Sequence, residues 1–164
     1  MKAVVVYESH WGNTAAIGRA IAEGIGDGTQ ALLTSEAAAE AMAGADLIVA
    51  GAPLLGFSLP SEQMVDGLKN DMGGPPSPPD LSHPLMRSWI ESLPAGQGRA
   101  AAFETRIWWS PGSAAKKILK LLEGKGYRPV QRERFMVTGR YGPLKDGELD
   151  RARAWGAELA KAAR

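Results

Sequence analysis

The chain has 164 residues, 45% of them hydrophobic and 23% charged, a composition typical of a folded globular protein that excludes a chain disordered throughout. Its formal net charge of +1, with both signs interspersed, argues against nucleic acid as a partner, and the absence of cysteine excludes disulfides, thiolate metal sites and a thiol nucleophile. With only two histidines no metal site is expected, and no apolar run suits a signal peptide or a membrane span, so we expect a single cytoplasmic domain over residues 1–164 without a membrane partner.

The first half of the sequence alternates short apolar strands with helices. A Val-rich run, Ala3–Tyr7, is typical of a strand buried on both faces of a parallel sheet. In Asn13–Ile25 the isoleucines recur at every fourth position, which predicts one buried stripe of a helix. Three further elements are predicted before the middle of the chain: a short strand at Gln30–Thr34, a short helix at Glu36–Ala43 and an apolar strand at Asp46–Gly51.

The second half continues this alternation around a proline-rich segment, residues 71–84, which cannot form regular structure because proline lacks an N–H group and fixes φ. We therefore expect about five strand–helix units, which form a parallel sheet covered by helices on both faces. The predicted elements are helices at Ser61–Leu68, Leu85–Leu93 and from Ser110 to Gly124, strands at Arg99–Phe103 and Arg134–Gly139, and a closing helix at Asp146–Ala163.

Three loops are expected at the edge of this sheet where ligands bind. In doubly wound sheets that edge lies beyond the carboxyl ends of the strands, where the strand order reverses. The loops are residues 9–14, 52–60 and 104–111. The second and third are unusually apolar for surface loops, which favours a ligand or partner site. Their apolar residues are Leu54, Leu55 and Phe57 in one loop and Ile107, Trp108 and Trp109 in the other.

The first of these loops reads S-H-W-G-N-T and joins a strand to a helix. Backbone N–H groups at a helix N-terminus lack partners and carry partial positive charge, so the loop could hold a phosphate without a lysine. Gly12 would allow close approach, and Ser9, Asn13 and Thr14 would add side-chain donors. Neither a P-loop nor a dinucleotide-binding glycine motif is present. The alternative interpretation is an ordinary helix cap, for which Ser, Asn and Thr are also favoured.

The motif S-x-x-G-N-T after a buried strand resembles the phosphate loop of short-chain flavodoxins, T/S-x-T-G-x-T, and segments such as A-F-E-T-R and G-P-L-K-D-G-E-L-D-R extend the resemblance over the chain. It implies a flavodoxin-like three-layer, doubly wound α/β sandwich with a five-stranded parallel sheet in the order 2-1-3-4-5. It also implies non-covalent FMN, with the phosphate on residues 9–14 and the isoalloxazine ring between the other two loops. The residues implied for FMN binding are Ser9, His10, Trp11, Gly12, Asn13, Thr14, Pro53, Leu54, Leu55, Gly56, Phe57, Thr105, Arg106, Ile107, Trp108 and Trp109.

Several positions depart from the flavodoxin pattern. Leu54 stands where flavodoxins usually carry Thr, Trp11 replaces a small hydroxyl residue, and E-T-R-I-W-W replaces G-D-x-x-x-Y after the fourth strand. In an extended chain Trp108 and Trp109 would point to opposite sides, so one of them is expected in the core. The other, or Phe57, would stack on the flavin.

Four polar side chains near this edge need an interpretation. Arg106 is either a cation beside the ring, which would raise the potential of the second electron, or a solvated surface residue. For His10 only the backbone N–H is expected to bind phosphate, with the imidazole a bystander. Tyr141 is a weaker candidate, and His83 is expected to be solvated. No catalytic residue and no metal ligand is predicted.

Together these observations predict an FMN-binding electron-transfer protein, a monomer or a homodimer, that works between a reductase and an acceptor. The near-neutral charge differs from the acidic surface usual in flavodoxins and predicts a less negative potential. Two alternatives remain open. One is an FMN-dependent NAD(P)H or quinone reductase whose pocket includes Trp108, Trp109 and the proline-rich segment. The other is a binding module that has kept the scaffold and lost FMN, for which Leu54 and the altered fourth loop are the support.

Overall fold

The computed structural model describes residues 1–71 and 73–164 and is built on a parallel sheet. The pairing order is β2-β1-β3-β4-β5, and every pairing is parallel, which confirms the predicted sheet. The order reverses between β1 and β3, so the ligand edge is expected beyond the ends of these two strands. The strands are β1 (Ala3–Tyr7), β2 (Gln30–Leu33), β3 (Leu47–Pro53), β4 (Arg99–Arg106) and β5 (Arg128–Met136).

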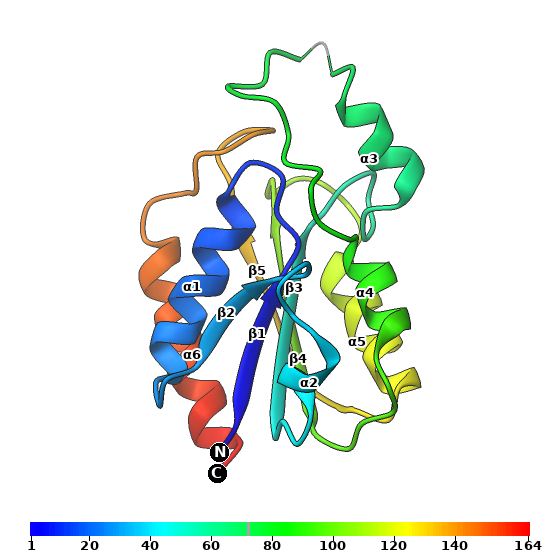
Figure 1. The fold of residues 1–164 in the computed structure, drawn as a ribbon. Coiled ribbons are helices and arrows are strands. Elements are labelled where there is room, and N and C mark those ends of the chain that lie inside the picture. Colours follow the sequence, from blue (N-terminus) through cyan, green and yellow to red (C-terminus); the bar gives the residue numbers. More distant parts are fainter. Residues whose placement is uncertain (72) are drawn as a thin grey trace.

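Helices cover both faces of the sheet and complete the predicted three-layer sandwich (Figure 1). One face packs against α1 and α6, and the other against α4, α5 and the short α2. Helix α3 lies toward the carboxyl ends of the strands, next to the proline-rich segment (Figure 1). The helices are α1 (Asn13–Ile25), α2 (Ala39–Met42), α3 (Glu62–Leu68), α4 (Met86–Ser92), α5 (Ala114–Gly124) and α6 (Glu148–Ala162).

The apolar character of β1 follows from its central position. Val5 and Tyr7 pack on the side of α1 and α6, whereas Val4 and Val6 pack on the side of α4 and α5. Every residue of β1 is therefore buried, as expected for a strand covered on both faces. The edge strand β5 is instead rich in exposed arginine, which discourages pairing with another chain.

Several boundaries differ from the sequence-based prediction, and three of the differences have a clear physical reason. Strand β4 continues to Arg106 because its last residues pair with β3 and β5 on either side, so the third edge loop begins later than predicted. Helix α5 begins after Ser113 instead of near Ser110, because the Ser113 hydroxyl accepts the Lys116 N–H (3.1 Å) and caps the helix. Strand β5 begins at Arg128, six residues before the predicted start, because an edge strand needs no apolar pattern on its exposed side.

Residues 73–84 of the proline-rich segment contain no helix or strand, as predicted. In the part of the chain that the structure describes, no helix combines the length and apolar composition needed to cross a membrane. Within the same residues, no group of three or more histidine, aspartate or glutamate side chains is placed to hold a metal ion.

Candidate functional site

The loop between β1 and α1 is organised around Ser9. Its hydroxyl accepts the backbone N–H groups of Gly12 (3.1 Å) and Ala15 (3.3 Å), which holds the loop against the first turn of α1. Gly12 has φ +92°, a left-handed conformation that costs other residues about 1 to 2 kcal/mol. No atom lies within 4 Å of the position that a Cβ would take at Gly12, so glycine is needed here for the backbone and not for space.

Two backbone donors remain free at the start of α1. Among the described residues, none accepts a hydrogen bond from the N–H of Asn13 or of Thr14. The side chains of these two residues are occupied: Asn13 Nδ2 donates to the Tyr141 carbonyl (2.9 Å), and the Thr14 hydroxyl bonds the Thr105 hydroxyl (2.8 Å) at the end of β4. The loop therefore offers an anion its backbone donors, with the side chains serving to fix its shape.

A cavity of about 120 Å³ lies where the three edge loops meet. A larger hollow of about 610 Å³ lies at the opposite edge of the sheet, around Gly98 and Tyr127, where none of these loops reaches. We assign the candidate site to the smaller cavity, because polar and apolar side chains from all three loops converge there. The predicted residues that line it are Ser9, His10, Trp11, Asn13, Thr14, Pro53, Leu54, Leu55, Thr105, Arg106 and Ile107.

The remaining predicted residues do not line the cavity; they are Gly12, Gly56, Phe57, Trp108 and Trp109. The cavity is also lined by residues that were not predicted as site residues: Leu68, Ser110, Val137 and Arg140.

The three aromatic residues predicted as candidates to stack on the ring, Phe57, Trp108 and Trp109, lie on the surface beside this cavity. Phe57 is 60% exposed, Trp108 76% and Trp109 63%. The prediction that one tryptophan belongs to the core was wrong, because residues 107–110 form a turn closed by the Ser110 N–H on the Ile107 carbonyl (3.2 Å), and alternation applies only to extended chain. The aromatic residues form an exposed rim, not a wall of the cavity.

Arg106 is buried and paired, so the interpretation as a solvated residue was wrong. Its Nη1 donates to Glu104 (3.0 Å) and to the Gly112 carbonyl (2.8 Å). Glu104, only 2% exposed, also accepts from the Ser113 hydroxyl (2.8 Å) and the Ala115 N–H (3.1 Å). The Nε of Arg106 has no partner among the described residues. A compensated positive charge therefore lines the cavity and ties the third loop to α5.

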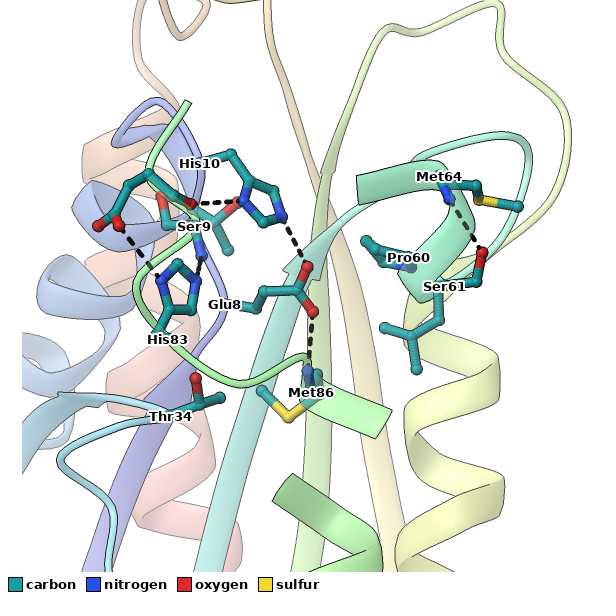
Figure 2. A network of polar contacts seen from close by, with 12 residues as sticks. Glu8, Ser9, His10, Thr34, Pro60, Ser61, Met64, His83 and Met86 are labelled. Atoms are coloured by element: carbon teal, nitrogen blue, oxygen red, sulfur yellow. Dashed lines mark hydrogen bonds and ion pairs between the residues drawn. The ribbon is translucent and has the colours of Figure 1, made fainter. Parts of the chain in front are cut away.

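Both histidines belong to one buried network under the first loop (Figure 2), contrary to the prediction of a bystander and a solvated residue. His10 Nε2 lies 2.7 Å from Glu8 Oε2, and Glu8 Oε1 accepts the Met86 N–H (2.8 Å). His83 accepts the Ser9 N–H on its Nε2 (3.2 Å) and stacks on His10 with 5.5 Å between ring centroids. The network joins the end of β1, the proline-rich segment and the start of α4.

The pKa values of the two imidazole rings are shifted in opposite directions. Burial opposes the charged form of His10, yet its hydrogen bonds to Glu8 and to the Asp80 carbonyl outweigh burial and raise its pKa above 6.5. Burial lowers the pKa of His83 below 6.5, and the adjacent His10 lowers it further. His83 therefore resists protonation at the position where it accepts the Ser9 N–H.

Glu8, Asp80 and His83 were missed by sequence reasoning. Glu8 carried one signal: it is a charged residue directly after a run buried on both faces. His83 carried none, because it lies 74 residues from Ser9 in a segment without periodicity. Tyr141, predicted as a weak candidate, contacts Trp11 edge to face (4.8 Å between ring centroids) and helps to enclose the loop.

An open, doubly wound sheet with a cavity beyond the ends of its central strands is characteristic of α/β proteins that bind small ligands. No family model matches the chain, and no curated protein does. Solved structures do match over nearly the whole chain. A flavodoxin from the domain Archaea has a TM-score of 0.67 at 20% identity, with 99% of each chain covered.

Two further solved structures extend this likeness. Flavodoxin 2 from Bacillus cereus has a TM-score of 0.69 at 15% identity, with 99% of each chain covered. A WrbA-like flavodoxin from Agrobacterium tumefaciens has a TM-score of 0.58 at 18% identity, over 99% of this chain and 97% of that one. The chain therefore has the flavodoxin fold.

Proposed function

We propose that this protein binds FMN non-covalently and carries electrons between a reductase and an acceptor. The observation that carries the proposal is the start of α1, where the backbone N–H groups of Asn13 and Thr14 have no acceptor among residues 1–71 and 73–164 and lie beside a cavity lined by apolar loops. When bound, FMN supplies chemistry of one or two electrons. Similarity to flavodoxins in fold supports the proposal by analogy.

The residues present suit the two ends of FMN differently. The phosphate end fits the free donors of the first loop, which need no lysine. The ring end fits the apolar side chains of Leu54, Leu55 and Ile107. The cavity of about 120 Å³ is small beside the roughly 300 to 1,000 Å³ usual for organic ligands, so the ring is expected to lie partly outside it, toward the exposed aromatic rim.

The chain's own residues have positioning roles in this proposal. Ser9 holds the loop in shape, and the pair of Thr14 and Thr105 ties that loop to the end of β4. Arg106 places a positive charge beside the cavity, which favours added negative charge on a reduced ring, and Glu104 offsets part of this effect. No general acid or base is required.

Flavin fluorescence titrations with FMN and riboflavin test the proposal. Riboflavin lacks the phosphate, and a hydrogen bond to a charged group contributes about 1.5 to 3 kcal/mol. We therefore expect FMN to bind at least about tenfold more tightly than riboflavin. Equal affinities would contradict a phosphate on the first loop.

A pair of glycine variants locates the phosphate. Gly12→Ala strains the loop and is expected to weaken FMN much more than riboflavin. Gly28→Ala is the matched control, because Gly28 also has a positive φ (+72°) and open space around it but lies in the turn between α1 and β2. If both variants changed FMN affinity equally, the first loop would not be the phosphate site.

A second candidate function is a binding module without flavin, which the small cavity favours. Such a module would bind a small anion on the same loop. FMN fluorescence separates the two, because both candidates can bind inorganic phosphate in an isothermal titration but only the module leaves FMN fluorescence unchanged.

A further inference from the structure

Residues 77–84 of the proline-rich segment, here called the strap, cross the first loop and are bonded to it at several points. The Asp80 N–H donates to the His10 carbonyl (2.8 Å), and His10 Nδ1 bonds the Asp80 carbonyl (2.9 Å). Trp11 Nε1 donates to the Ser77 carbonyl (3.0 Å). The strap therefore covers the loop whose backbone donors form the candidate anion site.

One contact of the strap bears directly on the residue that organises this loop. His83 Nε2 accepts the backbone N–H of Ser9 (Figure 2). The Ser9 hydroxyl in turn accepts the backbone N–H groups of Gly12 and Ala15. His83 thus acts on the helix start through Ser9.

The hydrogen bonds define where the protons lie. Because an N–H donates to His83 Nε2, that nitrogen carries no proton, and the neutral ring holds its proton on Nδ1. His10 Nδ1 must donate, since its partner is a carbonyl, so a single proton is shared between His10 Nε2 and Glu8. A second proton on His83 could only be placed on Nε2, facing the Ser9 N–H.

The charged groups around His83 compensate such a proton only in part, because burial and His10 oppose it more strongly than Asp80 and Glu8 favour it. His10 stacks on its face at 5.5 Å, and protonated His10 would repel it. The Asp80 carboxylate lies 3.7 Å from Nδ1, on the far side of the ring from Ser9, and is already bonded to Ser82. The negative charge of Glu8 favours a proton on His83, but Glu8 is already paired with His10.

We propose that His83 is a positioning residue for the anion-binding loop: its neutral ring holds the Ser9 amide, and a proton on that ring removes the acceptor and breaks this hydrogen bond between the strap and the loop. For FMN the consequence rests on the proposed function. If FMN binds only the form with neutral His83, one proton opposes binding, and the affinity for FMN falls by up to about tenfold for each pH unit below the pKa of His83.

The chain has two histidines, so both rings can be followed by NMR from about pH 8 to about pH 4.5 together with the protection factor of the Ser9 amide. We expect Ser9 protection to fall as the His83 ring takes up its proton. A Ser9 amide that stays protected down to the lowest pH, whether or not His83 has titrated, overturns the proposal.

Three variants separate positioning from a merely structural contact. His83→Gln keeps an acceptor that does not titrate, so Ser9 protection is expected to persist in acid. His83→Phe keeps a flat ring without an acceptor, so protection is expected to be low at every pH. Thr34→Val is the matched control, because it removes another tie to the strap, from the Thr34 hydroxyl to the Pro84 carbonyl, without a titrating group. If the protection of the Ser9 amide still falls at low pH in His83→Gln, the proposal is overturned.

FMN titrations on the same samples measure the affinity for FMN independently of the protection of the Ser9 amide. A tighter FMN complex at pH 8 than at pH 5, with the difference abolished in His83→Gln, supports both proposals. If FMN binds at neither pH while Ser9 protection follows the His83 titration, the proposed function fails and the positioning role stands.

Discussion

The buried pair of Glu104 and Arg106 gives the sharpest prediction about stability. Glu104→Ala leaves the Arg106 guanidinium buried without its carboxylate and removes the acceptor of Ser113 and Ala115. Breaking a buried ion pair from one side typically costs about 3 to 5 kcal/mol. At about 2 to 4 °C per kcal/mol for a chain of this size, the midpoint of thermal unfolding should fall by roughly 6 to 20 °C.

Urea unfolding of single and double variants measures this coupling. Replacing both residues, as in Glu104→Leu with Arg106→Leu, removes both buried charges. The double variant should therefore lose less free energy of unfolding than the sum of the losses in the two single variants. A loss below about 1 kcal/mol in Glu104→Ala, or strict additivity in the double variant, would refute the argument that the pair holds the third loop on α5.

Three further predictions concern pH, packing and potential. The pKa of His83 is lowered, so the stability that its neutral ring contributes is complete above about pH 6.5 and is lost as the pH falls. The pKa of His10 is raised, so the stability that its charged ring contributes is lost as the pH rises above 6.5. Urea unfolding from pH 5 to pH 8 should therefore show a lower free energy of unfolding at both ends of this range, and His83→Gln should reduce the loss at the acid end. Gly51→Ala should cost about 1 to 3 kcal/mol, because its Cβ would lie 2.2 Å from the buried Phe103 ring, and an unchanged melting temperature would contradict this packing. With FMN bound, the near-neutral chain and Arg106 predict a second reduction potential less negative than that of acidic flavodoxins, which a potentiometric titration giving a conventional low value would contradict.

The fold was predictable because its evidence is local. The uninterrupted Val run of β1 and the isoleucine stripe of α1 are each contained in a short window, and the loop between them carries its own glycine and hydroxyl residues. The ends of β4 and β5 were less predictable, because pairing with neighbouring strands extends them through polar residues.

The candidate site was predictable only in the parts that are formed by residues close together in the sequence. Alternation placed Trp108 or Trp109 in the core, and a turn placed both outside it. The contact of His83 with Ser9 depends on the path of the proline-rich segment, which no periodic pattern encodes. Arg106 was left with two interpretations, because only the position of Glu104 two residues earlier on the same face of β4 shows that it is buried and paired.

The central claim is that the loop of residues 9–14 holds FMN, and the visible spectrum of the protein tests it most directly. The purified protein, incubated with FMN and then desalted, should retain flavin absorption bands at about one flavin per chain with quenched fluorescence. A colourless protein that leaves FMN fluorescence unchanged would contradict the claim and assign the loop to a helix cap or to another anion.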